Sequence, residues 1–231
     1  MTENQTKSLQ VFYDEDYYGG ISFAEASTRH LRPNKKRELD FYKSLYTPKS
    51  GEKLLDIGCG TGDYLVTVEE TRAELWGIDI SNNAAEVAKR RLKRPEKILC
   101  QSADPLPFRD GEFDAVTSFG SIEHIPNLDS ILSEIHRVLK KGGHAILMVP
   151  NLYYYQFIWK TLRKGTGPVR HQLCEQLYSF GEWKNLIEKA GFKILRLRRH
   201  NKFNKPLLMW LRELLIPFYL SNHFAFVCTK V

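Results

Sequence analysis

Five short apolar runs mark the middle of the chain, and each has the length of a β-strand. The runs are apolar on both faces, as strands of a buried parallel sheet must be. Between them lie segments with helical periodicity. The clearest is 128–139, which places Leu128, Ile131, Leu132 and Ile135 on one face. Alternating strands and helices predict an α/β fold with a doubly wound, mostly parallel sheet. The five runs are 53–58, 74–80, 97–102, 113–119 and 144–149.

Local signals set the ends of two helices. Ser81 is expected to cap the helix 82–92, because a serine side chain can accept from a free N–H of the first turn. The sequence KKGG at 140–143 is expected to supply the cationic last turn and the glycine stop of the helix 128–139. In open parallel sheets, ligands bind beyond the carboxyl ends of the strands, so the functional residues are sought there.

Three regions interrupt the alternation of strands and helices. Residues 1–50 precede the first strand and are expected to form an N-terminal cap. Residues 151–178 are rich in aromatic side chains, and 203–220 are strongly apolar. The chain has no internal repeat and no low-complexity linker, so we expect one domain over 1–231, with the two insertions near a substrate site and the cofactor held by 52–150.

Composition limits the class of protein and its cellular location. Apolar residues make up 42% of the chain, enough for a sizeable core, and the formal net charge is +7. We interpret the charge as an ordinary basic surface, since the sequence carries no nucleic-acid-binding signature. The four cysteines are scattered, which argues against a zinc site or a disulfide framework, so no metal is expected. No apolar stretch is long enough to cross a bilayer. These features favour a cytoplasmic protein.

A glycine-rich loop after the first apolar run is the strongest chemical signal. It reads DIGCGTGD over 56–63 and is expected to lie between a strand and a helix. Glycines there let a ligand approach the main chain closely. A dinucleotide fingerprint would need a third glycine where Asp63 stands, and a P-loop would need GK followed by Ser or Thr. Asp56 before the loop instead suits a cationic ligand end, such as the ammonium and sulfonium of S-adenosylmethionine.

The sequence LLDIGCGTGDY at 54–64 resembles the first motif of class I S-adenosylmethionine-dependent methyltransferases, of the small-molecule group called type 11. The resemblance continues to about residue 199 and implies a seven-stranded Rossmann-like fold with S-adenosylmethionine as cofactor. It implies that Asp79 binds the ribose hydroxyls and that Asp104 accepts from the adenine amine. The cofactor residues implied by the resemblance are Asp56, Gly58, Cys59, Gly60, Gly62, Asp79, Ile80, Ala103, Asp104 and Phe119.

The segment after the fourth run bears on the methyl acceptor. It lacks the [DN]PP[YF] sequence of adenine and glutamine methyltransferases and the cysteine of cytosine C5 enzymes. We therefore expect a hydroxyl, amine or carboxylate of a small or lipid-like molecule as acceptor. His124 is the candidate general base or substrate orienter, and a purely structural loop residue is the alternative. Tyr17, Tyr18, Tyr153 and His171 are the candidate substrate residues.

Other interpretations remain open from the sequence. The chain could be a cofactor-binding but non-catalytic partner subunit. It could also be a nicotinamide-dependent oxidoreductase, although Asp63 at the position of the third glycine disfavours this. The 203–220 segment suits a helix packed on the core, a homodimer interface, an apolar lid, or a peripheral membrane contact assisted by Lys160, Arg163 and Lys164.

Overall fold

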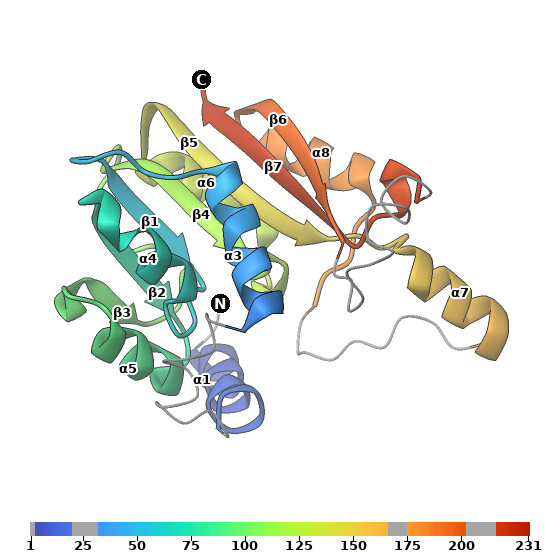
Figure 1. Ribbon diagram of the computed structural model, residues 1–231, viewed down its shortest axis with the longest axis horizontal. Helices are drawn as coiled ribbons and strands as arrows, with labels where there is room; N and C mark the ends of the chain where they lie inside the picture. The colour runs from blue at the N-terminus through green and yellow to red at the C-terminus, as the bar shows by residue number, and fades with distance from the viewer. Residues whose placement is uncertain (1–2, 20–31, 166–174, 202–215) are drawn as a thin grey trace.

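Seven strands form a single sheet in the computed structural model, which describes residues 3–19, 32–165, 175–201 and 216–231 (Figure 1). The strand order is β3-β2-β1-β4-β5-β7-β6. All neighbouring pairs are parallel except β5 with β7 and β6 with β7, so β7 alone runs against the others. This sheet confirms the predicted fold class. The strands are β1 (Lys53–Ile57), β2 (Glu74–Asp79), β3 (Ile98–Cys100), β4 (Phe113–Phe119), β5 (Leu139–Pro150), β6 (Phe192–His200) and β7 (His223–Lys230).

Helices cover both faces of the sheet (Figure 1). One buried cluster joins α3, α4 and α5 to the sheet through Leu39, Leu65 and Ala88. A second cluster joins α6 and α8 to the opposite face through residues such as Leu132 and Trp183. Burying each large apolar side chain contributes roughly 1.5–3 kcal/mol, so the two layers hold the strand ends in fixed positions. The helices are α1 (Glu3–Phe12), α3 (Pro33–Leu45), α4 (Asp63–Val68), α5 (Asn82–Arg91), α6 (Leu128–Val138), α7 (Tyr155–Lys164) and α8 (Phe180–Lys189).

The helix starts follow from capping side chains. Ser81 accepts from the Ala84 N–H at the start of α5, as the sequence predicts. Asn127 caps α6 in the same way. Ser179 and Glu182 form a reciprocal capping box at the start of α8.

The end of α6 differs from the prediction. The helix stops at Val138, and 140–143 belong to β5 rather than to a last helical turn and a glycine stop. Along β4 the pairing moves from Phe113 to Ala115 while along β5 it moves from Leu139 to His144, so 140–143 form an irregularity in the strand. Gly142 there has a φ of 74°, which explains the glycine. The last turn of α6 instead carries His136 and Arg137. Arg137 supplies the positive charge there, because burial lowers the pKa of His136.

Two added segments stand outside the layers. The N-terminal α1 continues into a short π-helix, η1 (Tyr13–Tyr17), beside α5, whereas α7 projects away from the body of the molecule (Figure 1). His171 and residues 203–215 of the apolar segment lie outside the described residues. None of the helices within the described ranges has the length and apolar character needed to cross a bilayer.

Candidate functional site

The glycine loop links β1 to α4 and is held against β2. The amides of Gly58 and Cys59 both donate to the Ile78 carbonyl, at 2.8 and 3.1 Å. Gly58, Gly60 and Gly62 have φ values of 67°, 53° and 76°, in the left-handed region that favours glycine. A Cβ on Gly58 would stand 2.2 Å from the Ser121 hydroxyl oxygen. The loop therefore needs glycine both for its turn and for its close contacts.

Asp79, at the end of β2, is tied to the loop by its carboxylate. One oxygen accepts from the Gly60 N–H at 2.7 Å and the other from the Ser81 N–H at 2.9 Å. The side chain is buried, and burial raises the pKa of Asp79 to about 6, while the two N–H donors work in the opposite direction. Asp79 thus sits beside the loop with a carboxylate that a hydroxyl-bearing ligand can reach.

Asp56 ends β1 on the other side of the loop. It is 4% exposed, and its Oδ1 accepts from the Thr117 hydroxyl at 2.7 Å. Burial raises the pKa of Asp56 to about 7, the Thr117 hydrogen bond opposes this, and the nearby charge of Asp79 adds to it. A cation at this position would stabilise the ionised carboxylate.

Two cavities open beside the loop, of about 110 and 300 Å³. The residues that line both cavities are Tyr17, Tyr18, Gly58, Gly120, Ser121 and His124. The first cavity is further lined by the largely apolar set Leu9, Tyr13, Ile57, Ile78, Asp79, Ile80, Gln101, Ser102, Ala103, Ile125 and Pro126.

The second cavity is more polar. Its wall includes Asp56, Cys59, Gly60 and Phe119 from the sequence-predicted set. It also includes residues that the sequence did not predict, from α3, the segment before α8 and the strand ends of β5 and β7. These are Lys35, Glu38, Leu39, Tyr42, Met148, Pro150, Glu175 and His223. Glu123, the neighbour of His124, lines this cavity as well. Together the two cavities suit an elongated ligand with an apolar ring and hydroxyls at one end and a cationic group at the other.

An aromatic wall backs the second cavity. The Tyr42 and Phe119 rings are stacked with centroids 4.1 Å apart, and the Tyr64 ring meets Phe119 edge-on at 4.9 Å. The Tyr42 hydroxyl donates to Glu38 at 2.9 Å. Burial and this neighbouring carboxylate raise the pKa of Tyr42 well above its ordinary value, so it stays a neutral phenol. Phe119 is thereby fixed as one wall of the site.

Asp63, in the first turn of α4, is surrounded by cations. The Arg91 guanidinium lies 2.7 Å from Asp63 Oδ1 and donates to the Thr61 carbonyl at 2.6 Å, and Lys35 Nζ lies 3.5 Å from Asp63 Oδ2. The negative charge of Asp63 is therefore compensated by Arg91 and Lys35. The ion pairs instead occupy the start of α4 and fasten the outer side of the glycine loop to α5 and α3.

The N-terminal segment closes the first cavity. Asp14 in η1 accepts from the Ser81 hydroxyl at 2.6 Å and from the Asn83 N–H at 3.0 Å, and the Asn83 amide donates back to the Asp14 carbonyl at 2.9 Å. This anchor brings Tyr17 and Tyr18 to the glycine loop. The Tyr18 hydroxyl would lie 2.8 Å from a Cβ on Gly60. Sequence reasoning found the tyrosines from their clustering but not Asp14.

His124 ends the short 3₁₀ turn η4 (Ile122–His124), directly after β4. Its Nε2 lies 3.8 Å from Glu123 Oε1, an ion-pair distance if the imidazole is protonated, and its ring is 6.4 Å from that of Tyr13. His124 lines both cavities, so it lies between a ligand bound in the first cavity and a ligand bound in the second.

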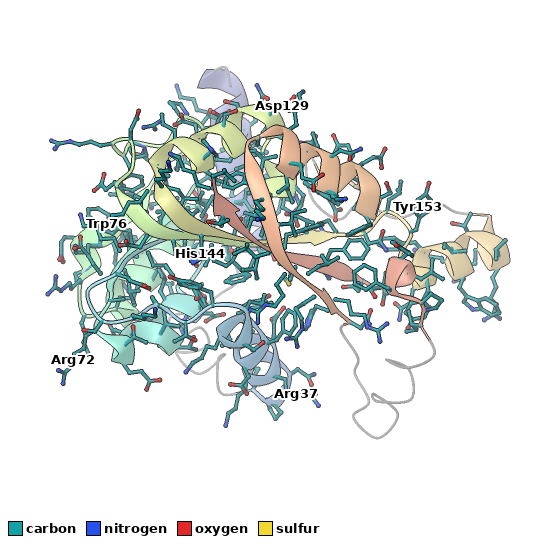
Figure 2. The ribbon with its side chains drawn as sticks, turned by 90° about the horizontal axis from the view of Figure 1, so that it is seen from above. Arg37, Arg72, Trp76, Asp129, His144 and Tyr153 are labelled. Atoms are coloured by element: carbon teal, nitrogen blue, oxygen red, sulfur yellow. The ribbon has the colours of Figure 1, made fainter. Side chains whose placement is uncertain are left out.

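Some predicted site residues lie elsewhere. Asp104 lines neither cavity, and its Oδ1 accepts from the Ser130 hydroxyl of α6 at 2.7 Å. Gly62 also lines neither cavity and packs against Ala88 of α5. Tyr153 is 53% exposed at the base of α7, on the projecting side of the molecule (Figure 2). His171 lies outside the described residues.

The chain is similar to known methyltransferases in both sequence and fold. A family profile for a methyltransferase domain matches residues 55–147. An uncharacterized protein of Methanocaldococcus jannaschii is 30% identical over 203 residues, which cover 79% of this chain and 78% of that protein. A demethylmenaquinone methyltransferase of Staphylococcus saprophyticus is 30% identical over 228 residues, covering 86% and 94%. In fold, the chain is similar to phosphoethanolamine N-methyltransferase 2 of Haemonchus contortus, solved with S-adenosyl-L-methionine. That match has a TM-score of 0.66 and 18% identity, and it covers 96% of this chain and 59% of that one.

Proposed function

The chain belongs to the class I S-adenosylmethionine-dependent methyltransferases, and from this premise we propose that it methylates a hydroxyl, amine or carboxylate of a small or lipid-like molecule at the two cavities beside the glycine loop. The observation that carries the proposal is the pair of buried carboxylates, Asp79 and Asp56, one in each cavity wall. The family assignment sets aside the nicotinamide-dependent oxidoreductase and the non-catalytic subunit.

We assign the cofactor to residues that suit its parts. Asp79 would accept the ribose hydroxyls, since a carboxylate receives two such hydrogen bonds well. Ile80 and Ala103 would pack on the adenine in the largely apolar first cavity. Asp56, in the wall of the second cavity, would hold the ammonium of the methionine part. Asp104 is set apart from this group by its bond to Ser130, so we expect it to shape the loop after β3 rather than to contact the adenine.

The acceptor would lie in the second cavity. Bound S-adenosylmethionine supplies a methyl group already activated by a sulfonium, so the protein's main task is to align the acceptor and exclude water. Phe119 and Tyr42 offer a flat wall for the acceptor. Tyr17 and Tyr18 would cover both ligands from the N-terminal side. His124 would orient the acceptor and take its proton where the attacking atom must lose one.

A small-molecule acceptor is supported by two observations. The chain lacks the sequence signatures of nucleic-acid base methylation after β4. Several staphylococcal relatives with 29–30% identity are named demethylmenaquinone methyltransferases, and that name describes a small-molecule acceptor for those proteins.

Isotope transfer tests the acceptor class. Cell extract is incubated with the purified protein and S-adenosylmethionine carrying a deuterated methyl group, then separated into protein, nucleic-acid, aqueous-metabolite and organic-soluble fractions. We expect label above the extract-only background in one of the two small-molecule fractions with wild type and none above it with Gly60→Val, because a branched side chain is strained at the Gly60 φ of 53°. Label confined to protein or nucleic acid would refute the proposed acceptor class, and mass spectrometry of the labelled product would identify the acceptor.

A further inference from the structure

Helix α7 leaves the body of the molecule from a firmly attached base. The Asn151 side-chain amide, just before it, donates to the carbonyls of Tyr219 and Ser221, both at 2.8 Å. Tyr154 is buried at 6% exposure. The helix itself contains no buried residue and projects away from the sheet (Figure 1). Its position is therefore fixed at one end while its length is presented to the surroundings.

One face of α7 is apolar. Tyr155, Ile158, Trp159 and Leu162 follow the i, i+3, i+4, i+7 spacing that places side chains on a single stripe. Three of them are exposed, Ile158 by 36%, Trp159 by 61% and Leu162 by 77%. A helix that packs on a core would bury this stripe. Its exposure therefore indicates a surface that binds another molecule or a membrane.

Three basic side chains of α7 lie outside this apolar stripe. Lys160, Arg163 and Lys164 lie in the helix, and 151–165 contain no acidic residue. The Arg163 guanidinium lies 5.9 Å from the centre of the Trp159 ring, a cation–π contact. Basic side chains beside exposed tryptophan and leucine are the composition of helices that lie in the interface of an anionic membrane.

We propose that α7 binds the surface of membranes that contain anionic lipid, with the Ile158, Trp159 and Leu162 stripe inserted at the headgroup boundary. A helix of 10 residues is about 15 Å long, half of the ~30 Å hydrocarbon core, so it lies in the interface and does not span it. A second copy of the chain suits this face less well, because antiparallel pairing would bring like charges together. The inference does not depend on the identity of the methyl acceptor.

Vesicle flotation tests the contact with the full chain. The protein is mixed with phosphatidylcholine vesicles with or without phosphatidylglycerol, at low and high salt. We expect binding only with phosphatidylglycerol, weakened by salt. Trp159→Ser with Leu162→Ser should lower the partition coefficient tenfold or more, because the inserted apolar area is lost. Lys160→Gln with Lys164→Gln should lower it roughly fivefold per lysine.

Matched controls distinguish vesicle binding by α7 from non-specific hydrophobic or electrostatic binding by the rest of the surface. Leu195→Ser removes an apolar side chain that is 51% exposed on β6, and Lys93→Gln with Lys189→Gln removes the same charge elsewhere. Both controls should bind vesicles as wild type does, and thermal melting would establish that every variant is folded. Absence of binding at low salt, or equal losses in helix variants and controls, would overturn the proposal. So would a concentration-dependent dimer that Trp159→Ser with Leu162→Ser dissolves in the absence of vesicle binding.

Discussion

Cofactor affinity should depend on pH through Asp56, and the direction follows from its surroundings. Burial raises the pKa of this carboxyl to about 7 in the free protein. If the cofactor's ammonium binds beside it, the complex requires the ionised form and the pKa falls on binding. The ligand's α-amino group, with a pKa of about 7.7–8.0, stays protonated below neutral pH. Affinity should therefore rise as pH increases toward 7.

The size of the effect comes from the ionised fraction of Asp56. With a pKa of about 7, that fraction rises from roughly 3% at pH 5.5 to half at pH 7.0, so affinity should increase roughly 15-fold over this range. Asp79, whose pKa is raised to about 6, would add to the slope. Asp56→Asn should bind more weakly and show a distinctly shallower profile, because one of the two titrating carboxyls is gone.

The same raised pKa has a consequence for stability without ligand. An aspartate whose folded pKa lies above its unfolded value stabilises the fold below the unfolded pKa, near 3.8, and this contribution is lost as pH rises through about 7. Wild type should therefore lose stability between about pH 4 and 8, by an amount on the order of 4 kcal/mol for a shift of this size. Asp56→Asn should lose less.

Calorimetric titrations with S-adenosylmethionine at several pH values, in buffers of different ionisation enthalpy, measure both the affinity and the protons released on binding. Thermal melts of the ligand-free proteins over the same pH values supply the stability comparison. Equal pH slopes in wild type and Asp56→Asn would contradict the role assigned to Asp56, as would an affinity that falls as pH rises from 5.5 to 7.0.

Further substitutions test other parts of the site. Asp79→Ala should weaken cofactor binding by about 1.5–3 kcal/mol, measured by calorimetry, through loss of charge-assisted hydrogen bonds; unchanged affinity in a folded variant would contradict the assignment. Gly60→Val should abolish cofactor binding in the same measurement. His124→Ala should lower turnover roughly 10²–10⁴-fold with cofactor affinity unchanged, and a loss under tenfold would leave alignment alone as the mechanism. Asp14→Ala should weaken docking of the N-terminal segment by about 1–2 kcal/mol and speed its limited proteolysis, whereas Asp16→Ala, the exposed neighbour, should have no effect.

The sheet and the loop side of the site were predictable because they follow from patterns local in sequence. Buried apolar runs predicted five of the seven strands, β1 to β5. The resemblance to class I methyltransferases predicted that Asp79 belongs to the same cofactor site as the glycine loop, and the Gly60 N–H donates to Asp79 across 19 positions of the chain.

The sequence did not predict contacts between side chains that are far apart along the chain. Asp14 reaches Ser81 across 67 positions, and Arg91 reaches Asp63 across 28. No periodicity reports such pairs, because they depend on how helices pack. Asp104 shows the complementary limit: its position after β3 was expected, yet its carboxylate bonds to Ser130 on α6. A sequence pattern places the backbone at a strand end, while packing decides where the side chain bonds.

Calorimetric titration of the purified chain with S-adenosylmethionine, with NADH as a parallel ligand, tests the cofactor assignment. We expect one binding site per chain for S-adenosylmethionine, lost in Gly60→Val, and no binding of NADH. Absence of S-adenosylmethionine binding by the folded protein, or binding that survives in Gly60→Val, would contradict the assignment of the cofactor to the cavities beside the glycine loop.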